Sequence, residues 1–133
     1  MAGGPRVSES PLQAREVTLA YDRNVVTRDL TVSIPEDGFT AIVGPNACGK
    51  STLLRALVRM LKPRSGAVVL DGAEISSQPT RLVAQRVGLL PQSSTAPDGI
   101  TVADLVARGR HPYQRLLRQW SREDEQAVLG AMA

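Results

Sequence analysis

One run of nine residues has the residue types and the spacing that bind phosphate. It reads Gly44-Pro45-Asn46-Ala47-Cys48-Gly49-Lys50-Ser51-Thr52 and fits G-x-x-x-x-G-K-[ST], the pattern of the P-loop. In such a loop the backbone N–H groups surround an anion, and the N-terminus of the next helix adds its partial positive charge. The pattern assigns Lys50 to the β- and γ-phosphates and the Ser51 hydroxyl to Mg²⁺. We therefore predict nucleotide binding here, over the alternative of an ordinary glycine-rich turn.

A P-loop needs a strand before it and a helix after it, and the sequence predicts both. Residues 39–43 are apolar and partly β-branched, as in a buried strand. After the loop, apolar residues recur at the three- and four-residue spacing of an amphipathic helix, at Leu53, Leu54, Leu57, Met60 and Leu61.

The composition indicates one globular domain or part of one. The chain has 133 residues, 42% of them hydrophobic, and a net charge of +3. This small basic excess does not indicate nucleic acid as a partner. No stretch approaches the ~20 apolar residues of a membrane span, and the N-terminus has no signal-peptide pattern. Cys48 is the only cysteine, so the chain can form no intrachain disulfide, and we expect it to be cytosolic. Because Cys48 occupies a variable position of the P-loop, we interpret it as a small filler.

The remaining strand signals surround the P-loop region. We expect residues 1–11 to be a disordered leader, and residues 12–20 and 30–34 to form strands. Residues 67–70 form another predicted strand, which Asp71-Gly72 closes with a hairpin-type turn. Residues 87–90 are a short apolar run typical of a buried strand, and Gln92 follows at its C-terminal end, the edge where open α/β sheets bind ligands.

The second half of the chain is predicted to be mainly helical. Residues 80–85 are compatible with one short helix. Thr101 and Ser121 each begin a capping-box pattern with an acid three residues later, which predicts a helix after each of them. We expect Gly109 to end the first of these two helices.

With the P-loop and Gln92 placed, the sequence resembles the N-terminal half of an ABC-type ATPase, the nucleotide-binding domain of ABC transporters. Residues 44–52 are close to that family's Walker A wording, and Leu89-Leu90-Pro91-Gln92 resembles its Q-loop. The stretch from Thr101 to Tyr113 is similar to the corresponding stretch in the ATP-binding subunits of importers for iron–siderophore complexes, haem and cobalamin. The resemblance covers residues 12–133. It implies an α/β P-loop NTPase fold, with an N-terminal antiparallel β-subdomain and the start of a helical subdomain.

The resemblance also implies roles for residues outside the loop. Tyr21 falls where the family has an aromatic residue that stacks on adenine, although it could instead be a turn aromatic that half-covers the sheet. Gln92 would reach Mg²⁺ and the attacking water, although it could instead be a solvent-facing loop residue. His111 is the only histidine, so a His-based metal site is remote. The resemblance implies that Lys50 and Gln92 are the catalytic residues and that ATP and Mg²⁺ are the cofactors.

The implied function is the ATP-binding subunit of an importer for iron–siderophore complexes or a related metal chelate. Its implied partners are integral-membrane permease subunits, a second ATP-binding subunit and, indirectly, a substrate-binding protein. This places the chain on the cytoplasmic face of the cell membrane. Two alternatives are a soluble ABC-type ATPase that acts on nucleic acid or the ribosome, and another P-loop NTPase such as a kinase or GTPase. The latter would leave Tyr21 and the Gln92 loop unexplained.

The sequence departs from the family pattern in two ways. The family usually has glycine where this chain has Ala47, and alanine would strain the loop by roughly 1–3 kcal/mol if that position needs a positive φ. The chain also contains no Leu-Ser-Gly-Gly-Gln signature, no strand ending in Asp-Glu and no switch histidine. In the family these motifs lie further toward the C-terminus, so we expect a truncated chain with an open sheet edge, weak nucleotide binding and negligible hydrolysis.

Overall fold

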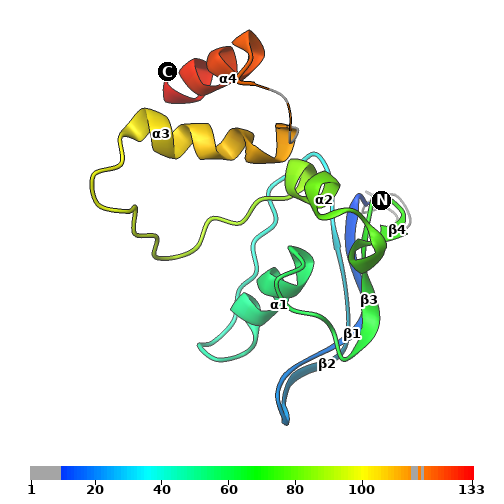
Figure 1. Ribbon diagram of the computed structural model, residues 1–133. Coiled ribbons are helices and arrows are strands. Elements are labelled where there is room, and N and C mark those ends of the chain that lie inside the picture. The colour runs from blue at the N-terminus through cyan, green and yellow to red at the C-terminus, as the bar shows by residue number, and fades with distance from the viewer. Residues whose placement is uncertain (1–9, 115–116, 118) are drawn as a thin grey trace. The chain divides into compact units, whose positions relative to one another are not determined.

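The computed structural model describes residues 10–114, 117 and 119–133, which form two compact units. The first unit ends at Pro79 and holds the sheet and the P-loop; the second begins at Thr80 and is helical. The antiparallel β-subdomain followed by helices that the sequence predicts is confirmed (Figure 1).

The first unit is built on a four-stranded antiparallel sheet of order β2-β1-β3-β4. Its strands are β1 (Leu12–Tyr21), β2 (Asn24–Ile34), β3 (Ser65–Leu70) and β4 (Ala73–Glu74). The predicted hairpin turn is confirmed: Asp71 and Gly72 both have positive φ, as a two-residue turn between twisted strands requires. Of the predicted leader, residues 1–9 lie outside the described residues. At its end, the Pro11 carbonyl accepts a hydrogen bond from the Asp71 N–H, 2.7 Å away.

A bulge in β1 shapes the core. The pairing register shifts between Ala14 and Val17, and Glu16 between them has a φ of 48°. The shift lets both apolar residues be fully buried although they are three positions apart. Gly66 lies opposite the bulge, where a Cβ would approach the Glu16 carbonyl oxygen to 2.2 Å. Glycine is therefore required at this point of β3.

Helix α1 (Lys50–Leu57) packs its apolar side on β1 (Figure 1). Leu53, Ala56 and Leu57 are buried there, which confirms the predicted helix and part of its apolar stripe. Leu54 is exposed, and Met60 lies beyond the helix end, where Arg59 has a φ of 65°. The predicted stripe was thus too long, because the chain leaves the helix after Leu57.

The two predicted strands at 39–43 and 87–90 were wrong. Both segments are coil, and the side chains of Phe39 and Leu90 are 96% and 89% exposed. A strand exists only where its backbone groups pair with a neighbour. Within the described ranges, no strand lies beside either segment, so apolar composition alone does not make them strands.

The second unit contains the helices α2 (Thr80–Arg86), α3 (Val102–Ala107) and α4 (Arg122–Met132). A 3₁₀ turn, η2 (Arg108–Tyr113), follows α3. A shorter 3₁₀ turn, η1 (Ile75–Ser77), belongs to the first unit and lies near its end. Both predicted helix starts are confirmed: the side chains of Thr101 and Ser121 accept hydrogen bonds from the N–H groups three residues on. Helix α3 ends at Ala107 with Arg108 as its C-cap, directly before Gly109 as expected, but the chain continues through Gly109 as the 3₁₀ turn η2. The chain changes from α-helix to 3₁₀ turn at Arg108, because in an α-helix the Pro112 ring would collide with the carbonyl group of Arg108.

Two arginines hold the second unit together. The Arg81 guanidinium donates to the carbonyls of Pro112 and Tyr113, at 2.6 and 2.9 Å. Arg110 forms a 2.8 Å ion pair with Asp124 of α4, and its guanidinium lies 4.3 Å from the centre of the Tyr113 ring. Hydrogen bonds from Ser121 and Arg110 lower the pKa of the Asp124 carboxyl from its ordinary 3.8 to about 2. This carboxylate therefore joins α4 to η2.

Candidate phosphate-binding site

The P-loop lies between the coil at 39–43 and the first turn of α1. Gly49 is the residue before the helix, with a φ of 96°, and Ala47 has a φ of 64°. Alanine therefore occupies a left-handed conformation that favours glycine, which answers the question that the sequence left open. This conformation strains the loop by roughly 1–3 kcal/mol.

The N-terminus of α1 is suited to an anion. No side chain caps Gly49, and the first turn contains no acidic residue. The first intrahelical hydrogen bond runs from the Leu53 N–H to the Gly49 carbonyl, at 2.9 Å. The N–H groups of residues 50–52 thus have no acceptor within the helix, and the positive end of the helix dipole is not compensated by a carboxylate. A phosphate would supply both the missing acceptors and the negative charge.

The two motif glycines leave no room for side chains. A Cβ at Gly44 would come within 2.7 Å of the Cys48 sulfur, and a Cβ at Gly49 within 2.8 Å of a Val26 methyl group. The loop therefore folds tightly on itself and against β2, and it presents backbone where larger residues would fill the space. These residues fit a nucleotide phosphate with its Mg²⁺ ion.

The Lys50 ammonium lies against the loop. It donates to the carbonyl oxygens of Gly44 and Pro45, both at 2.6 Å, and lies 3.6 Å from the Cys48 sulfur. The motif lysine therefore faces the cradle in the structure. Ser51 and Asn46 are exposed, and the binding of Mg²⁺ by Ser51 stays a prediction.

Tyr21 lies at the end of β1 and is tied to α1. Its hydroxyl accepts a hydrogen bond from Arg55, 3.2 Å away, and its side chain is 40% exposed. The hydrogen bond from Arg55, and after it one with Thr52, lower the pKa of the Tyr21 phenol. The structure thus brings Tyr21 together with the helix that follows the P-loop, while leaving much of the ring open.

Two residues near the site escaped the sequence reasoning, and the roles predicted for the site residues stay predictions. Arg55 and Val26 contact site residues that are more than 20 positions away in sequence, so no local pattern identifies them. Gln92 lies in the exposed coil of the second unit, and its contact with Mg²⁺ stays a prediction.

Within the described part of the chain, no three His, Cys, Asp or Glu residues gather to hold a metal ion. Among the same residues, no helix is long and apolar enough to cross a bilayer.

Comparison with known proteins places this geometry in a family. The family profile described as ABC transporter matches residues 27–132. The chain is 51% identical over 125 residues to the ferric enterobactin transport ATP-binding protein FepC of Escherichia coli, covering 94% of this chain and 46% of that protein. It is 45% identical over 121 residues to the achromobactin transport ATP-binding protein CbrD of Dickeya dadantii, covering 91% and 45%.

The fold agrees with these sequence matches. A solved structure of the ATP-binding subunit of an ABC transporter superposes with a TM-score of 0.70 at 20% identity, covering 83% of this chain and 45% of that one. The chain spans about half the length of the curated relatives it matches.

Proposed function

Because this chain belongs to the ABC transporter ATP-binding family, we propose that its residues 44–52 bind the phosphates of Mg–ATP. The observation that carries the proposal is the uncapped N-terminus of α1 behind a glycine at φ 96°, with the Lys50 ammonium held against the loop. The free backbone N–H groups, the positive end of the α1 dipole and the Lys50 ammonium thus lie together in one short segment. That combination binds a polyphosphate better than any uncharged ligand.

Each side chain of the site has a part in this proposal. Lys50 would exchange its two carbonyl acceptors for the β- and γ-phosphate oxygens, where the opposite charge makes the hydrogen bond stronger. The Ser51 hydroxyl would hold Mg²⁺, and the ion supplies charge neutralisation between the phosphates. Gln92 would orient water near the γ-phosphate.

Tyr21 would stack on the adenine ring. Its exposed ring offers a flat apolar surface, and the hydrogen bond from Arg55 fixes the ring's position relative to α1. Arg55 is thereby a positioning residue for the base, and it is the residue that a sequence motif does not reveal.

The whole protein would be the ATPase subunit of an importer for iron–siderophore complexes. Support comes from the similarity to FepC and CbrD, which are ATP-binding proteins for the transport of ferric enterobactin and achromobactin. ATP binding and hydrolysis would then be coupled to transport through permease subunits and a second ATP-binding subunit, at the cytoplasmic face of the membrane. The relatives' names do not favour the alternative that acts on nucleic acid or the ribosome.

A calorimetric titration of the 133-residue chain with Mg–ATP tests the binding proposal. Lys50→Met removes a charge-assisted contact of about 1.5–3 kcal/mol, which weakens binding by roughly 10- to 150-fold. The chain offers a matched control, since Lys62 is its only other lysine; Lys62→Met should leave the affinity unchanged. Equal losses in both variants would refute the proposed role of Lys50.

Adenine stacking is tested with the two tyrosines of the chain. Tyr21→Leu should weaken the binding of ATP while leaving that of inorganic tripolyphosphate unchanged, because only ATP has a base to stack. Tyr113→Leu, in the other unit, is the control and should change neither. If Tyr21→Leu weakened both ligands equally, Tyr21 would support the loop instead of the base.

The transport role is tested in the organism that carries the gene. Lys50→Met at the chromosomal locus should abolish uptake of a ferric siderophore and spare uptake of an unrelated nutrient. Undiminished siderophore uptake would contradict the importer assignment, and it would leave the nucleotide site itself to the calorimetric test.

A further inference from the structure

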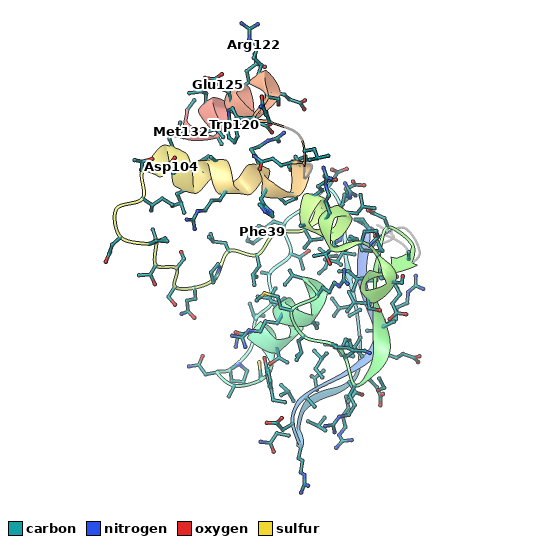
Figure 2. The ribbon with its side chains drawn as sticks, viewed as in Figure 1. Phe39, Asp104, Trp120, Arg122, Glu125 and Met132 are labelled. Atoms are coloured by element: carbon teal, nitrogen blue, oxygen red, sulfur yellow. The ribbon has the colours of Figure 1, made fainter. Side chains whose placement is uncertain are left out.

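The end of β1 that carries Tyr21 has less support than the rest of the strand. β1 pairs with β3 from Leu12 to Thr18, and Ser65 at the start of β3 is the partner of Thr18. In the described part of the chain, residues 19–21 pair with β2 alone. This end of the β1–β2 hairpin therefore extends beyond the start of β3 (Figure 1 and Figure 2). A two-stranded ribbon is marginal by itself, so other contacts must hold it in place.

Arg64, the residue before β3, supplies such contacts. Its backbone N–H donates to the Thr18 carbonyl, 2.8 Å away, and its guanidinium donates to the Asp22 carbonyl. Thr18 lies three residues before Tyr21, and Asp22 directly follows it. One residue thus holds the backbone on both sides of Tyr21.

The far end of the Tyr21 side chain is held from a different element. Its hydroxyl accepts a hydrogen bond from Arg55 of α1, 3.2 Å away. A tyrosine side chain has two rotatable bonds, so the ring has one orientation when its backbone and its hydroxyl are both held. Without the guanidinium of Arg64, the hairpin end would be free to move relative to α1, and the hydroxyl would lose its partner.

From these contacts we infer that Arg64 is a positioning residue for Tyr21, and that it thereby strengthens the binding of adenine. The inference rests on the proposed function, in which Tyr21 stacks on the base of ATP. A ring that is already held in place loses less freedom when the base binds, so the affinity is higher. Arg64 acts through Tyr21 and does not need to touch the nucleotide.

A first test needs no nucleotide. In a Tyr113→Phe background Tyr21 is the only tyrosine, so its ionisation can be followed by absorbance. The hydrogen bond from Arg55, and after it one with Thr52, lower the pKa of the Tyr21 phenol. Arg64→Met should move this titration to higher pH, because a ring that is no longer held against α1 loses these bonds.

The control for the lost charge is Arg23→Met, which removes a guanidinium from the same turn. It should leave the titration unchanged. Arg64 is exposed, and Arg64→Met keeps the backbone hydrogen bond to Thr18, so the substitution leaves the core intact. An unchanged titration in Arg64→Met, or an equal shift in Arg23→Met, would overturn the inference.

A second test measures the binding of ATP and of inorganic tripolyphosphate, each with Mg²⁺, by calorimetry. Arg64→Met should weaken ATP binding roughly three- to tenfold, a part of what a base–aromatic stack contributes. Tripolyphosphate has no base, so its affinity should not change. In a Tyr21→Leu background Arg64→Met should weaken ATP binding no further, because the residue that it positions is already gone.

The outcomes separate this inference from the proposed function. Equal losses for ATP and tripolyphosphate in Arg64→Met, or a full further loss in the Tyr21→Leu background, would overturn the inference. If Tyr21→Leu weakens ATP binding and Arg64→Met changes neither the titration nor the affinity, adenine stacking stands and the inference fails. If the titration shifts while both variants bind ATP as the wild type does, adenine stacking is refuted and the positioning of Tyr21 by Arg64 stands.

Discussion

Replacing Ala47 by glycine should stabilise the protein, against the usual direction of alanine-to-glycine changes. Ala47 has a φ of 64°, where an L-residue brings its Cβ too close to the following carbonyl. That conformation costs roughly 1–3 kcal/mol, whereas glycine adds about 0.4–1 kcal/mol of conformational entropy to the unfolded chain. The difference predicts that Ala47→Gly raises the free energy of unfolding by about 1 kcal/mol.

Urea denaturation followed by circular dichroism gives the free energy directly, provided that the slope with denaturant is unchanged. In thermal unfolding the same gain corresponds to an increase in Tm of roughly 3–5 °C for a chain of this size. Ala41→Gly is the matched control: Ala41 is exposed coil in the same unit and has no positive φ, so glycine should lower stability there. Ala47→Val should also lower stability, because a β-branched side chain tolerates this φ least.

The reasoning would be refuted if Ala47→Gly lost stability by the same amount as Ala41→Gly. Such a result would mean that residue 47 relaxes to a negative φ in solution, and that the loop does not require a left-handed residue there.

Three further predictions concern Asp124, Tyr21 and turnover. Asp124→Asn should lower the Tm at neutral pH, and the deficit should shrink as pH falls from 3.8 to about 2, because the stabilising carboxylate of the wild type is protonated over that range; a deficit independent of pH would contradict this. In a Tyr113→Phe background, Arg55→Met should shift the tyrosinate absorbance titration of Tyr21 to higher pH, since the guanidinium that lowers its pKa is gone; an unchanged titration would exclude the Arg55 contact. Phosphate release from Mg–ATP by the 133-residue chain should be negligible, because its sequence has no Asp-Glu strand end to polarise water, and steady turnover would contradict that expectation.

Local patterns predicted most of the elements correctly. Alternating residues placed β1 and the last five residues of β2, Asp71-Gly72 placed the hairpin, and the capping residues Thr101 and Ser121 placed two helix starts. The hairpin turn and the two helix caps are signals that are complete within a few residues, which is why they can be found in the sequence.

The failures arose where structure depends on distant partners. Residues 39–43 and 87–90 have strand composition, but a strand also needs a neighbour to accept its hydrogen bonds, and composition does not contain that information. Arg55 was missed for the same reason, because its contact with Tyr21 joins residues 34 positions apart. The motif itself, by contrast, predicted a helix directly after the loop, and α1 begins at Lys50, because a P-loop is a continuous segment.

The central claim, that residues 44–52 recognise phosphates, is tested most directly by titrating the chain with ATP, AMP and inorganic tripolyphosphate, each with Mg²⁺. We predict that tripolyphosphate binds and competes with ATP, because the loop's donors, the helix dipole and Lys50 all act on the phosphate chain. AMP, which has no β- or γ-phosphate, should bind far more weakly than ATP. Equal affinity for AMP and ATP, with no competition by tripolyphosphate, would contradict the account.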